Sequence, residues 1–468
     1  MIYHLTDTIV ALSTPPGSGA IAVVRLSGNK AFDIVQSIFQ GKILSEQSSQ
    51  TLHFGKIINE EKKVLDEVLV SIFKAPNSYT KENVAEISCH ASSYIVQELL
   101  ALLVKKGARL ARAGEFTQRA YLNGQFDLSQ AEAVADLIAS ESKGAHELAM
   151  QQMRGGISKE IKRLRQELID FASLIELELD FGEEDVEFAN REVLRNTVQE
   201  IQDFIASLLQ SFQLGNAIKN GVNTVIAGRP NAGKSTLLNA LLDENRAIVS
   251  DIAGTTRDTI EEVLNIKGIA FRLIDTAGIR EAQDQIEAIG VEKTMEKIQQ
   301  SAILLYVFDV IETPPEEVAK DVVKLQQEGT ELLLIANKMD LNPYTEWEHY
   351  EGELRMSNKE YRMSKEQFIP ISAINDMNVE YLKEKLHKIV VNQDLQSNVI
   401  LSNTRHVEAL QKASESLGAV LVGLDTGITS DFVAMDIRQA LYFLGEIIGE
   451  VSSEDLLENI FGRFCIGK

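Results

Sequence analysis

Residues 228–235 read Gly-Arg-Pro-Asn-Ala-Gly-Lys-Ser, a glycine-rich loop with the spacing G-x-x-x-x-G-K-S. An apolar run precedes this loop and a helical pattern follows it, and such loops bind phosphates in this strand–loop–helix context. Backbone N–H groups at the helix N-terminus would face the phosphates, Lys234 would add a positive charge, and the Ser235 hydroxyl would bind Mg²⁺. The loop therefore predicts a site for a nucleoside triphosphate rather than a bare Gly-rich turn.

Three further motifs follow in order: Asp-Thr-Ala-Gly at 275–278, Asn-Lys-Met-Asp at 337–340 and Ser-Ala at 372–373. The Asp340 carboxylate can accept two hydrogen bonds from guanine, whereas adenine offers no donor there and would leave the charge unpaired. The stem of Lys338 can cover the base, and Asp275 is the candidate carboxylate on the metal side. The motifs predict GTP as the ligand. The predicted GTP-binding residues are Asn231, Ala232, Gly233, Lys234, Ser235, Thr236, Ser250, Asp251, Ile252, Ala253, Gly254, Thr255, Thr256, Asp275, Thr276, Ala277, Gly278, Asn337, Lys338, Asp340, Ser372 and Ala373.

The residue after Asp-Thr-Ala-Gly is Ile279, where many small GTPases place a glutamine that orients the attacking water. Isoleucine cannot orient water, so the catalytic polar group must lie elsewhere. The acidic residues of 280–287 are candidates, and each could equally belong to a solvated helix start. These acidic residues are Glu281, Asp284 and Glu287.

Charge compensation at the phosphates has two candidate sources. Arg257 and Arg280 could act as arginine fingers, or could be ordinary surface arginines. Asn231, inside the phosphate loop, could instead help to hold a monovalent cation against the phosphates through its amide oxygen. Thr256 lies in a segment that fits a mobile switch and could close over Mg²⁺.

Composition limits the other function classes. The 468 residues carry 46 Lys and Arg against 69 Asp and Glu, a formal net charge of −23, which argues against non-specific binding of nucleic acid by this chain alone. No apolar stretch is long enough for a membrane span, and the N-terminal residues do not resemble a signal peptide. The two cysteines, Cys89 and Cys465, lack partners at metal-site spacing and fit free thiols in a reducing cytoplasm.

Periodicity divides the chain into regions. Residues 1–118 mix short strand-like runs with helices, residues 119–216 are helical, residues 221–390 alternate apolar strands with helices, and residues 391–468 return to helix. Continuous apolar runs such as 302–308 and 332–336 suit a parallel sheet covered on both faces. We therefore expect a multidomain α/β protein in which a Ras-like P-loop domain is inserted into an α-helical domain, behind an α+β N-terminal domain.

Several motifs outside the nucleotide region carry a resemblance to a known family. They are Thr-Pro-Pro-Gly-Ser-Gly at 14–19, Val-Arg-Leu-Ser-Gly at 24–28, Ala-Gly-Glu-Phe-Thr-Gln-Arg-Ala at 113–120, Asp-Leu-Ser-Gln-Ala-Glu-Ala at 127–133 and the terminal Phe-Cys-Ile-Gly-Lys at 464–468. With the nucleotide motifs, they resemble the TrmE, or MnmE, family of tRNA modification GTPases over essentially the whole chain.

The resemblance implies site residues. The N-terminal domain would dimerise and bind a one-carbon tetrahydrofolate, in the 5,10-methylene or 5-formyl form, through Arg25, Glu86, Lys468 and the position of Gln125, where some members carry a basic residue. K⁺ would be bound by Asn231, Ser250, Ile252 and Thr255, and Mg²⁺ by Ser235 and Thr256. The implied catalytic residues are Glu287, which would orient the water, with Lys234, Arg280 and Cys465.

The resemblance also implies partners and a reaction. A homodimer would join the FAD protein MnmG in a heterotetramer and attach an aminomethyl or carboxymethylaminomethyl group to the wobble uridine of certain tRNAs. The alternatives are a ribosome-assembly GTPase, for which residues 1–468 show no Gly-x-x-Gly RNA clamp, and a signalling switch that needs an external activator.

The two cysteines receive different interpretations. Cys89 lies within a predicted strand over residues 84–89 and is read as structural. Cys465 could be a small buried apolar side chain, or, by the resemblance, a catalytic thiol on a tail that folds into the folate site. The acidic stretch 183–187 is read as a solvated helix face.

Overall fold

The computed structural model describes residues 6–17, 19–180, 190–242, 261–275, 301–327, 329–357, 363–391 and 399–467. These divide into two compact units. Unit 1 comprises residues 1–138, 150–203 and 408–468, and unit 2 comprises residues 139–149 and 204–407. The four domain boundaries expected from the sequence stay a prediction.

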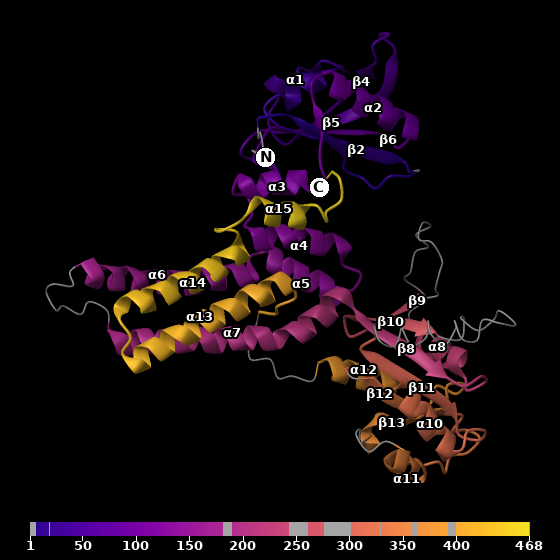
Figure 1. The fold of residues 1–468 in the computed structure, drawn as a ribbon. Coiled ribbons are helices and arrows are strands. Elements are labelled where there is room, and N and C mark those ends of the chain that lie inside the picture. The colour runs from indigo at the N-terminus through magenta and orange to yellow at the C-terminus, as the bar shows by residue number, and fades with distance from the viewer. Residues whose placement is uncertain are drawn as a thin grey trace. The chain divides into compact units, whose positions relative to one another are not determined.

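The N-terminal part of unit 1 is built on a seven-stranded, mostly antiparallel sheet with the order β3-β4-β5-β6-β2-β1-β7 (Figure 1). Its elements are β1 (Ile9–Leu12), β2 (Ile21–Ser27), α1 (Ala31–Gln36), β3 (Phe39–Gln40), β4 (Thr51–Ile58), β5 (Val64–Phe73), β6 (Val84–His90), α2 (Ser93–Lys105) and β7 (Arg109–Leu110). Alternate residues of β5 (Val68, Val70 and Ile72) are buried in one core with apolar residues of α1 and α2, because side chains alternate between the two faces of a strand. One face of the sheet is therefore covered by helices.

The other face of this sheet keeps large apolar side chains in solvent. Leu52 and Phe54 on β4 are 57% and 63% exposed, and Leu69, which pairs with Phe54 across to β5, is 40% exposed. A contiguous apolar area on a sheet face is typical of an interaction surface.

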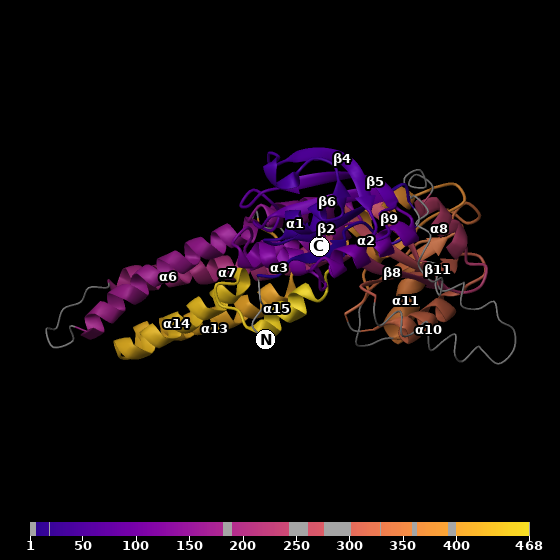
Figure 2. The same cartoon turned by 90° about the horizontal axis from the view of Figure 1, so that it is seen from above.

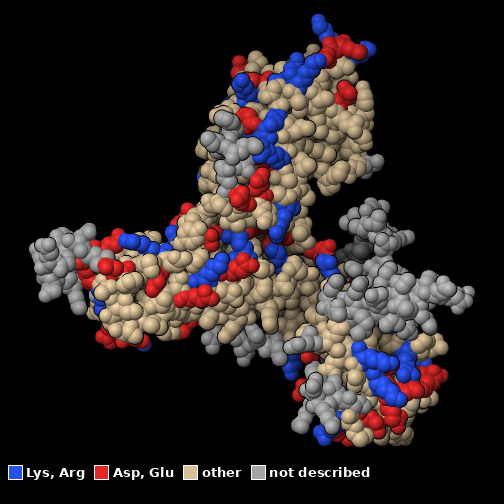
Figure 3. Space-filling view, in the orientation of Figure 1, with Lys and Arg blue, Asp and Glu red and all other residues tan. Residues whose placement is uncertain are grey.

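Helices complete unit 1. They are α3 (Glu115–Leu122), α4 (Leu128–Ala139), α5 (Lys143–Met153), α6 (Gly156–Asp180), α7 (Arg191–Asn220), α13 (Thr404–Thr426), α14 (Ser430–Ile448) and α15 (Glu454–Phe461), of which α4, α5, α7 and α13 have residues in unit 2. The long helices α6 and α14 lie side by side in two views (Figures 1 and 2). Acidic and basic side chains alternate over these helices on the face in Figure 3, and no large area of one sign is visible among the described residues of that face.

The helical character expected for residues 119–216 and 391–468 is confirmed by helices such as α4, α6 and α13. Helix α3 begins at Glu115, in a region that was expected to mix strands with helices. Glu115 is held by ion pairs described below. The acidic stretch 183–187 lies outside the described residues.

Unit 2 contains a six-stranded sheet with the order β13-β12-β11-β8-β10-β9. Its elements are β8 (Val222–Gly228), α8 (Lys234–Leu242), β9 (Glu261–Ile266), β10 (Ile269–Asp275), β11 (Ile303–Asp309), α10 (Pro315–Leu325), β12 (Glu331–Asn337), α11 (Glu348–Ser357), η3 (Lys365–Gln367), β13 (Phe368–Pro370) and α12 (Val379–Val390). All pairings except that of β9 with β10 are parallel. The expected buried parallel sheet is confirmed, and the antiparallel edge strand β9 is an addition.

Candidate functional site

The glycine-rich loop joins β8 to α8 at the carboxyl ends of the parallel strands. Gly228 adopts a φ of 155°, and a Cβ atom there would collide with the carbonyl of Val307 on β11, so only glycine fits at this position. The Nζ of Lys234 donates hydrogen bonds to the carbonyls of Gly228 at 2.9 Å and Arg229 at 2.8 Å. The loop therefore holds its lysine ammonium in place through its own backbone.

The polar side chains of the loop face outward. Asn231 has a φ of 60° and is exposed, as are Ser235 and Thr236 at the start of α8. Amide and hydroxyl oxygens in such positions are the hard ligands that K⁺ and Mg²⁺ prefer. The residues present at the loop thus fit the cations expected from the sequence.

Asn337 ties three of the predicted motifs together. It is 3% exposed; its Nδ2 donates to the carbonyl of Ala232 at 2.9 Å, and its Oδ1 accepts from the N–H of Ala373 at 3.1 Å. The phosphate loop, the Asn-Lys-Met-Asp segment and the Ser-Ala segment are consequently fixed to one another through a single buried amide.

Two short contacts orient the remaining base-site groups. The Nζ of Lys338 lies 2.6 Å from Oδ2 of Asp309, and Oγ of Ser372 donates to Oδ1 of Asp340 at 2.6 Å. Burial alone raises the pKa of Asp309, but Lys338 and the N–H of Ile311 outweigh it and hold that pKa below its usual range. Asp340 is exposed, so its unpaired charge would become costly only beneath a bound base.

Much of the predicted switch and catalytic region lies outside the described residues. Asp275 ends β10 beside β8, at the edge where the phosphate loop begins, and nothing is described of its side chain. The predicted residues outside the described ranges are Ser250, Asp251, Ile252, Ala253, Gly254, Thr255, Thr256, Arg257, Thr276, Ala277, Gly278, Arg280, Glu281, Asp284, Glu287 and Lys468.

A second polar site lies on the N-terminal sheet. Arg25 on β2 stands directly opposite Glu86 on β6, and the two side chains form an ion pair of 2.8 Å with 21% and 25% exposure. The guanidinium carbon of Arg25 lies 5.5 Å from the ring centre of Tyr79 and 5.7 Å from that of Phe116. Two aromatic faces thus orient a half-open arginine, whose donors, together with the Glu86 carboxylate, suit a ligand with both acceptors and donors.

Gln125 is linked to this arginine through intermediate contacts. Its side chain is exposed, and its chain neighbour Phe126 meets the ring of Tyr79 edge-on at 5.9 Å. The structure brings Arg25 and Glu86 together, whereas no described contact joins the side chain of Gln125 to either of them.

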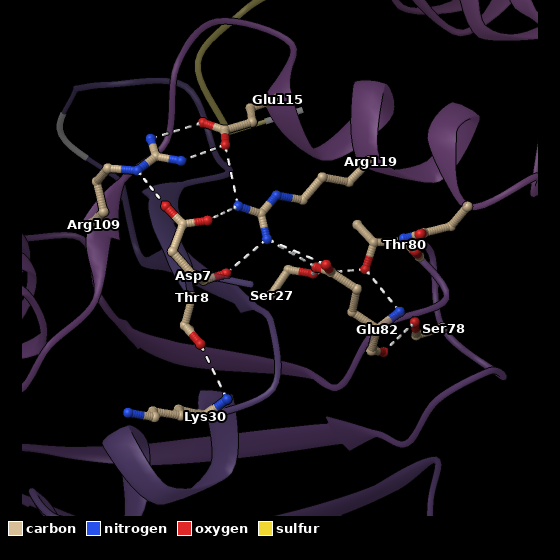
Figure 4. A network of polar contacts seen from close by, with 11 residues as sticks. Asp7, Thr8, Ser27, Lys30, Ser78, Thr80, Glu82, Arg109, Glu115 and Arg119 are labelled. Atoms are coloured by element: carbon tan, nitrogen blue, oxygen red, sulfur yellow. Dashed lines mark hydrogen bonds and ion pairs between the residues drawn. The ribbon is translucent and has the colours of Figure 1, made fainter. Parts of the chain in front are cut away.

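A buried network braces the same domain (Figure 4). Arg119 on α3, with a side chain 2% exposed, pairs with the carboxylates of Asp7, Glu82 and Glu115. Burial raises the pKa of Glu115, but Arg109 and the N–H of Arg112 outweigh it, so that pKa lies below its usual value. The network fixes α3, and with it Phe116, against the sheet.

Comparison with known proteins covers the whole chain. A family model described as the MnmE helical domain matches residues 128–465, and one described as the GTP-binding protein TrmE N-terminus matches residues 8–125. The tRNA modification GTPase MnmE of Cytophaga hutchinsonii is 52% identical over 99% of this chain and 98% of its own length. That of Flavobacterium psychrophilum is 52% identical over the full length of both chains.

The chain belongs to the MnmE (TrmE) family of tRNA modification GTPases.

Among solved structures, a variant of Aquifex aeolicus Era bound to GDP·AlF4⁻ overlaps at a TM-score of 0.27, with 23% identity over 42% of this chain and 66% of that chain. An overlap this low supports no conclusion. Membership of the MnmE family makes this chain a tRNA modification GTPase.

The C-terminal tail of this MnmE-family chain is docked rather than frayed. Ile466 forms an antiparallel bridge with Ala113, and the carbonyl of Gly467 accepts from Oγ of Ser13 at 3.1 Å. Cys465 is exposed, so its interpretation as a small buried side chain is wrong. The thiol stays in solvent because the tail anchors itself through Phe464 and Gly467 on either side.

Cys89 has the opposite environment. It is buried on β6, as expected, and burial together with the nearby Asp66 raises its pKa to about 11. This thiol is structural.

Several residues beside the two candidate sites were not predicted. Asp309 ends a buried parallel strand, as Asp275 does, and that position could have signalled it, because ligand-binding groups gather at the carboxyl ends of such strands. Tyr79 and Phe116 carry no sequence signal, since only the fold brings them to Arg25. Among the described residues, no group of three acidic, histidine or cysteine side chains could hold a metal ion, and no helix has the length and apolarity needed to cross a bilayer.

Proposed function

We propose that this chain is a K⁺-dependent GTPase that acts with the FAD protein MnmG on the wobble uridine of certain tRNAs. The product would be a 5-carboxymethylaminomethyl or aminomethyl group, with the one-carbon unit taken from a tetrahydrofolate. The observation that carries the proposal is the docked C-terminal tail. It presents an exposed Cys465 and ends at the β1–β2 pair that carries Arg25, an arrangement that GTP hydrolysis alone does not require.

The first part of the proposal, GTP hydrolysis, uses the groups around the phosphate loop. In hydrolysis, water adds to the γ-phosphorus while the bond from that phosphorus to the β–γ bridging oxygen breaks, and charge builds on the phosphate oxygens. Lys234 would offset that charge, and Glu287 would orient the water in place of a glutamine. Mg²⁺ held by Ser235 and Thr256, and K⁺ held by Asn231, Ser250, Ile252 and Thr255, would supply further positive charge when bound.

Comparing the rates of GTP hydrolysis in K⁺ and in Na⁺ tests this first part directly. GTP hydrolysis should proceed in K⁺ and fall to a small fraction of that rate in Na⁺ at equal ionic strength, because the larger ion fits a site built from several oxygens. A Glu287→Ala variant should still bind GTP with unchanged Kd while losing turnover. Equal rates in the two salts, or a Glu287→Ala variant with normal turnover, would remove these roles.

The second part of the proposal, folate binding, rests on the Arg25–Glu86 site of the N-terminal domain. The folate would be bound by the Arg25 guanidinium, the Glu86 carboxylate, Gln125 and the terminal Lys468. Arg25 and Glu86 form a partly exposed ion pair, and the aromatic rings around Arg25 reduce the entropy lost when its side chain is fixed by a ligand. Folate would carry the one-carbon unit, with glycine or ammonium as the nitrogen source.

The third part of the proposal concerns partners. The exposed apolar side chains Leu52, Phe54 and Leu69 on the open sheet face fit a homodimer of this domain, to which MnmG would add in a heterotetramer. Because the chain carries a net charge of −23, it should bind tRNA weakly alone, and a more basic partner would contact most of the phosphates. We place the complex in the cytoplasm, where free thiols persist.

Nucleoside analysis of tRNA from cells that lack this chain tests the proposal as a whole. The modified wobble uridine should disappear and return with the wild-type gene. A Cys465→Ser variant should restore GTP hydrolysis but not the modified nucleoside. Normal modified uridine in that variant would exclude a catalytic role for Cys465, whereas normal tRNA in cells that lack the chain would favour the ribosome-assembly alternative.

A further inference from the structure

Arg229, the residue that follows β8, is tied to helix α10 by its side chain. Its Nε donates to Oδ2 of Asp321 at 2.8 Å, and its Nη1 pairs with Glu317. Glu317 and Asp321 are four residues apart on α10, so one face of that helix presents both carboxylates to the guanidinium. Such a fork-shaped contact fixes orientation as well as distance.

The backbone of the same residue holds the lysine of the phosphate loop. The carbonyl of Arg229 accepts from Nζ of Lys234 at 2.8 Å and from the N–H of Ala232 at 3.3 Å. The side chain of Arg229 therefore contacts α10, and its backbone carbonyl contacts the phosphate loop.

The acidic partner is itself held by the sheet. The hydroxyl of Tyr306, on β11 and 1% exposed, donates to Oδ2 of Asp321 at 2.7 Å. Burial raises the pKa of Asp321, but Arg229 and Tyr306 outweigh it, so the carboxylate stays charged. With 19% exposure, Asp321 is more sheltered than the partners in most surface ion pairs.

We propose that Arg229 is a positioning residue for phosphate binding. By anchoring the first turn of the loop to Asp321 and Glu317, it fixes the carbonyls that orient the Lys234 ammonium. The site then binds the β- and γ-phosphates with less rearrangement. The proposal rests on GTP binding by this loop and is independent of K⁺ and folate.

Asp321→Asn distinguishes this role from a simple charge effect. Removing a negative charge near the phosphates would tighten nucleotide binding by long-range electrostatics, whereas a loosened loop weakens it. We expect the Kd for both GTP and GDP to rise about fivefold to tenfold, measured by displacement of a fluorescent GDP analogue in the full chain. An unchanged or lower Kd would overturn the proposal.

A matched control lies in the same unit. Glu366 pairs with Lys385 at 3.2 Å and is 81% exposed, and neither residue contacts the phosphate loop in any interaction described. Glu366→Gln removes one ion-pair carboxylate and should leave the Kd for GDP within about twofold of the wild type. A rise equal to that of Asp321→Asn would show that any lost ion pair loosens the unit, and would contradict a specific role.

The dependence on Lys234 is tested in a double variant. If Arg229 acts through the lysine, Asp321→Asn in a Lys234→Ala background should change the Kd for GDP by less than about twofold. Tyr306→Phe, which keeps the buried ring, should weaken binding in the same direction as Asp321→Asn but less. If Asp321→Asn still raises the Kd for GDP about fivefold to tenfold in the Lys234→Ala background, Arg229 does not act by positioning Lys234.

Discussion

The nucleotide site and the Arg25–Glu86 site use different routes to place polar groups. In the nucleotide site, Gly228 and Asn337 end the parallel strands β8 and β12 on either side of β11, and Ser372 follows β13 beside β12. Each motif is continuous in the sequence. In the N-terminal site, Arg25 and Glu86 meet only through antiparallel pairing, and the tail reaches Ser13 across 454 positions. The first site depends on local backbone geometry, and the second on the integrity of a whole domain.

The two regions also use arginines differently. Arg119 of the N-terminal network has a side chain 2% exposed, whereas Arg229 beside the phosphate loop is 38% exposed. A buried charge that loses its partner lowers the stability of the fold, whereas a half-exposed charge is solvated by water and lowers it little. We therefore expect Arg119 to determine stability, and Arg229 to act on ligand binding.

Arg119→Leu should give the largest effect. Three carboxylates would lose a buried partner, and the N-terminal domain should be destabilised by about 3–5 kcal/mol. Hydrogen exchange of β1, β2 and α3 should accelerate, while urea unfolding followed at Trp347, the single tryptophan and part of unit 2, should be unchanged.

The comparison for this variant is Arg163→Leu on α6. That arginine is 53% exposed and pairs with Glu160 and Glu167, so its loss should cost no more than about 1 kcal/mol. Equal effects of the two substitutions would mean that burial does not distinguish the networks.

Asp340→Asn should give the next largest effect, confined to the nucleotide site. The amide offers a donor where guanine also has donors, so the affinity for GTP should fall about a hundredfold. The same amide can donate to the extra carbonyl of xanthine, so xanthosine triphosphate should gain affinity. Nucleotide titration checks both, and unchanged selectivity would assign base recognition to another group.

Gly467→Ala should release the tail from the N-terminal site with a smaller effect. Gly467 has a φ of 96°, and a Cβ there would collide with the carbonyl of Leu12. Digestion by carboxypeptidase should accelerate about tenfold, while GTP hydrolysis stays within about twofold of the wild type.

Gly107→Ala is the control for Gly467→Ala, because it introduces a Cβ at a positive φ without a collision. Gly107 has a similar φ of 104° but no atom within 4 Å of an added Cβ. It should leave the tail protected from carboxypeptidase. If both variants release the tail, a general loosening of the N-terminal domain by strained substitutions explains the release, and contact with Leu12 does not.

The smallest expected effect concerns the two thiols. The folded pKa of Cys89 is raised to about 11, so at pH 8 only about one molecule in a thousand carries the thiolate, a fraction that grows tenfold with each pH unit below 11. Alkylation at pH 8 should therefore modify only the exposed Cys465 in the folded chain. Mass spectrometry of a Cys465→Ser variant should show no label, and labelling of Cys89 there would contradict its burial.

Short motifs were enough to predict the chemistry of the nucleotide site. Lys234, Asn337 and Asp340 lie in segments whose geometry comes from a strand end and a helix start, so their spacing predicts their positions. The parallel sheet was predictable as well, since short apolar runs that alternate with helical segments are typical of a sheet covered by helices on both faces.

The remaining contacts came from tertiary packing. Tyr79 and Phe116 enclose Arg25, Asp321 anchors Arg229, and Gly467 rests on β1 because elements far apart in the chain pack together. Such contacts depend on strand register and helix placement, which local patterns do not encode. The same limit explains why the exposure of Cys465 could be found only from the fold: an anchor at Gly467 and a buried Phe464 hold the thiol between them in solvent.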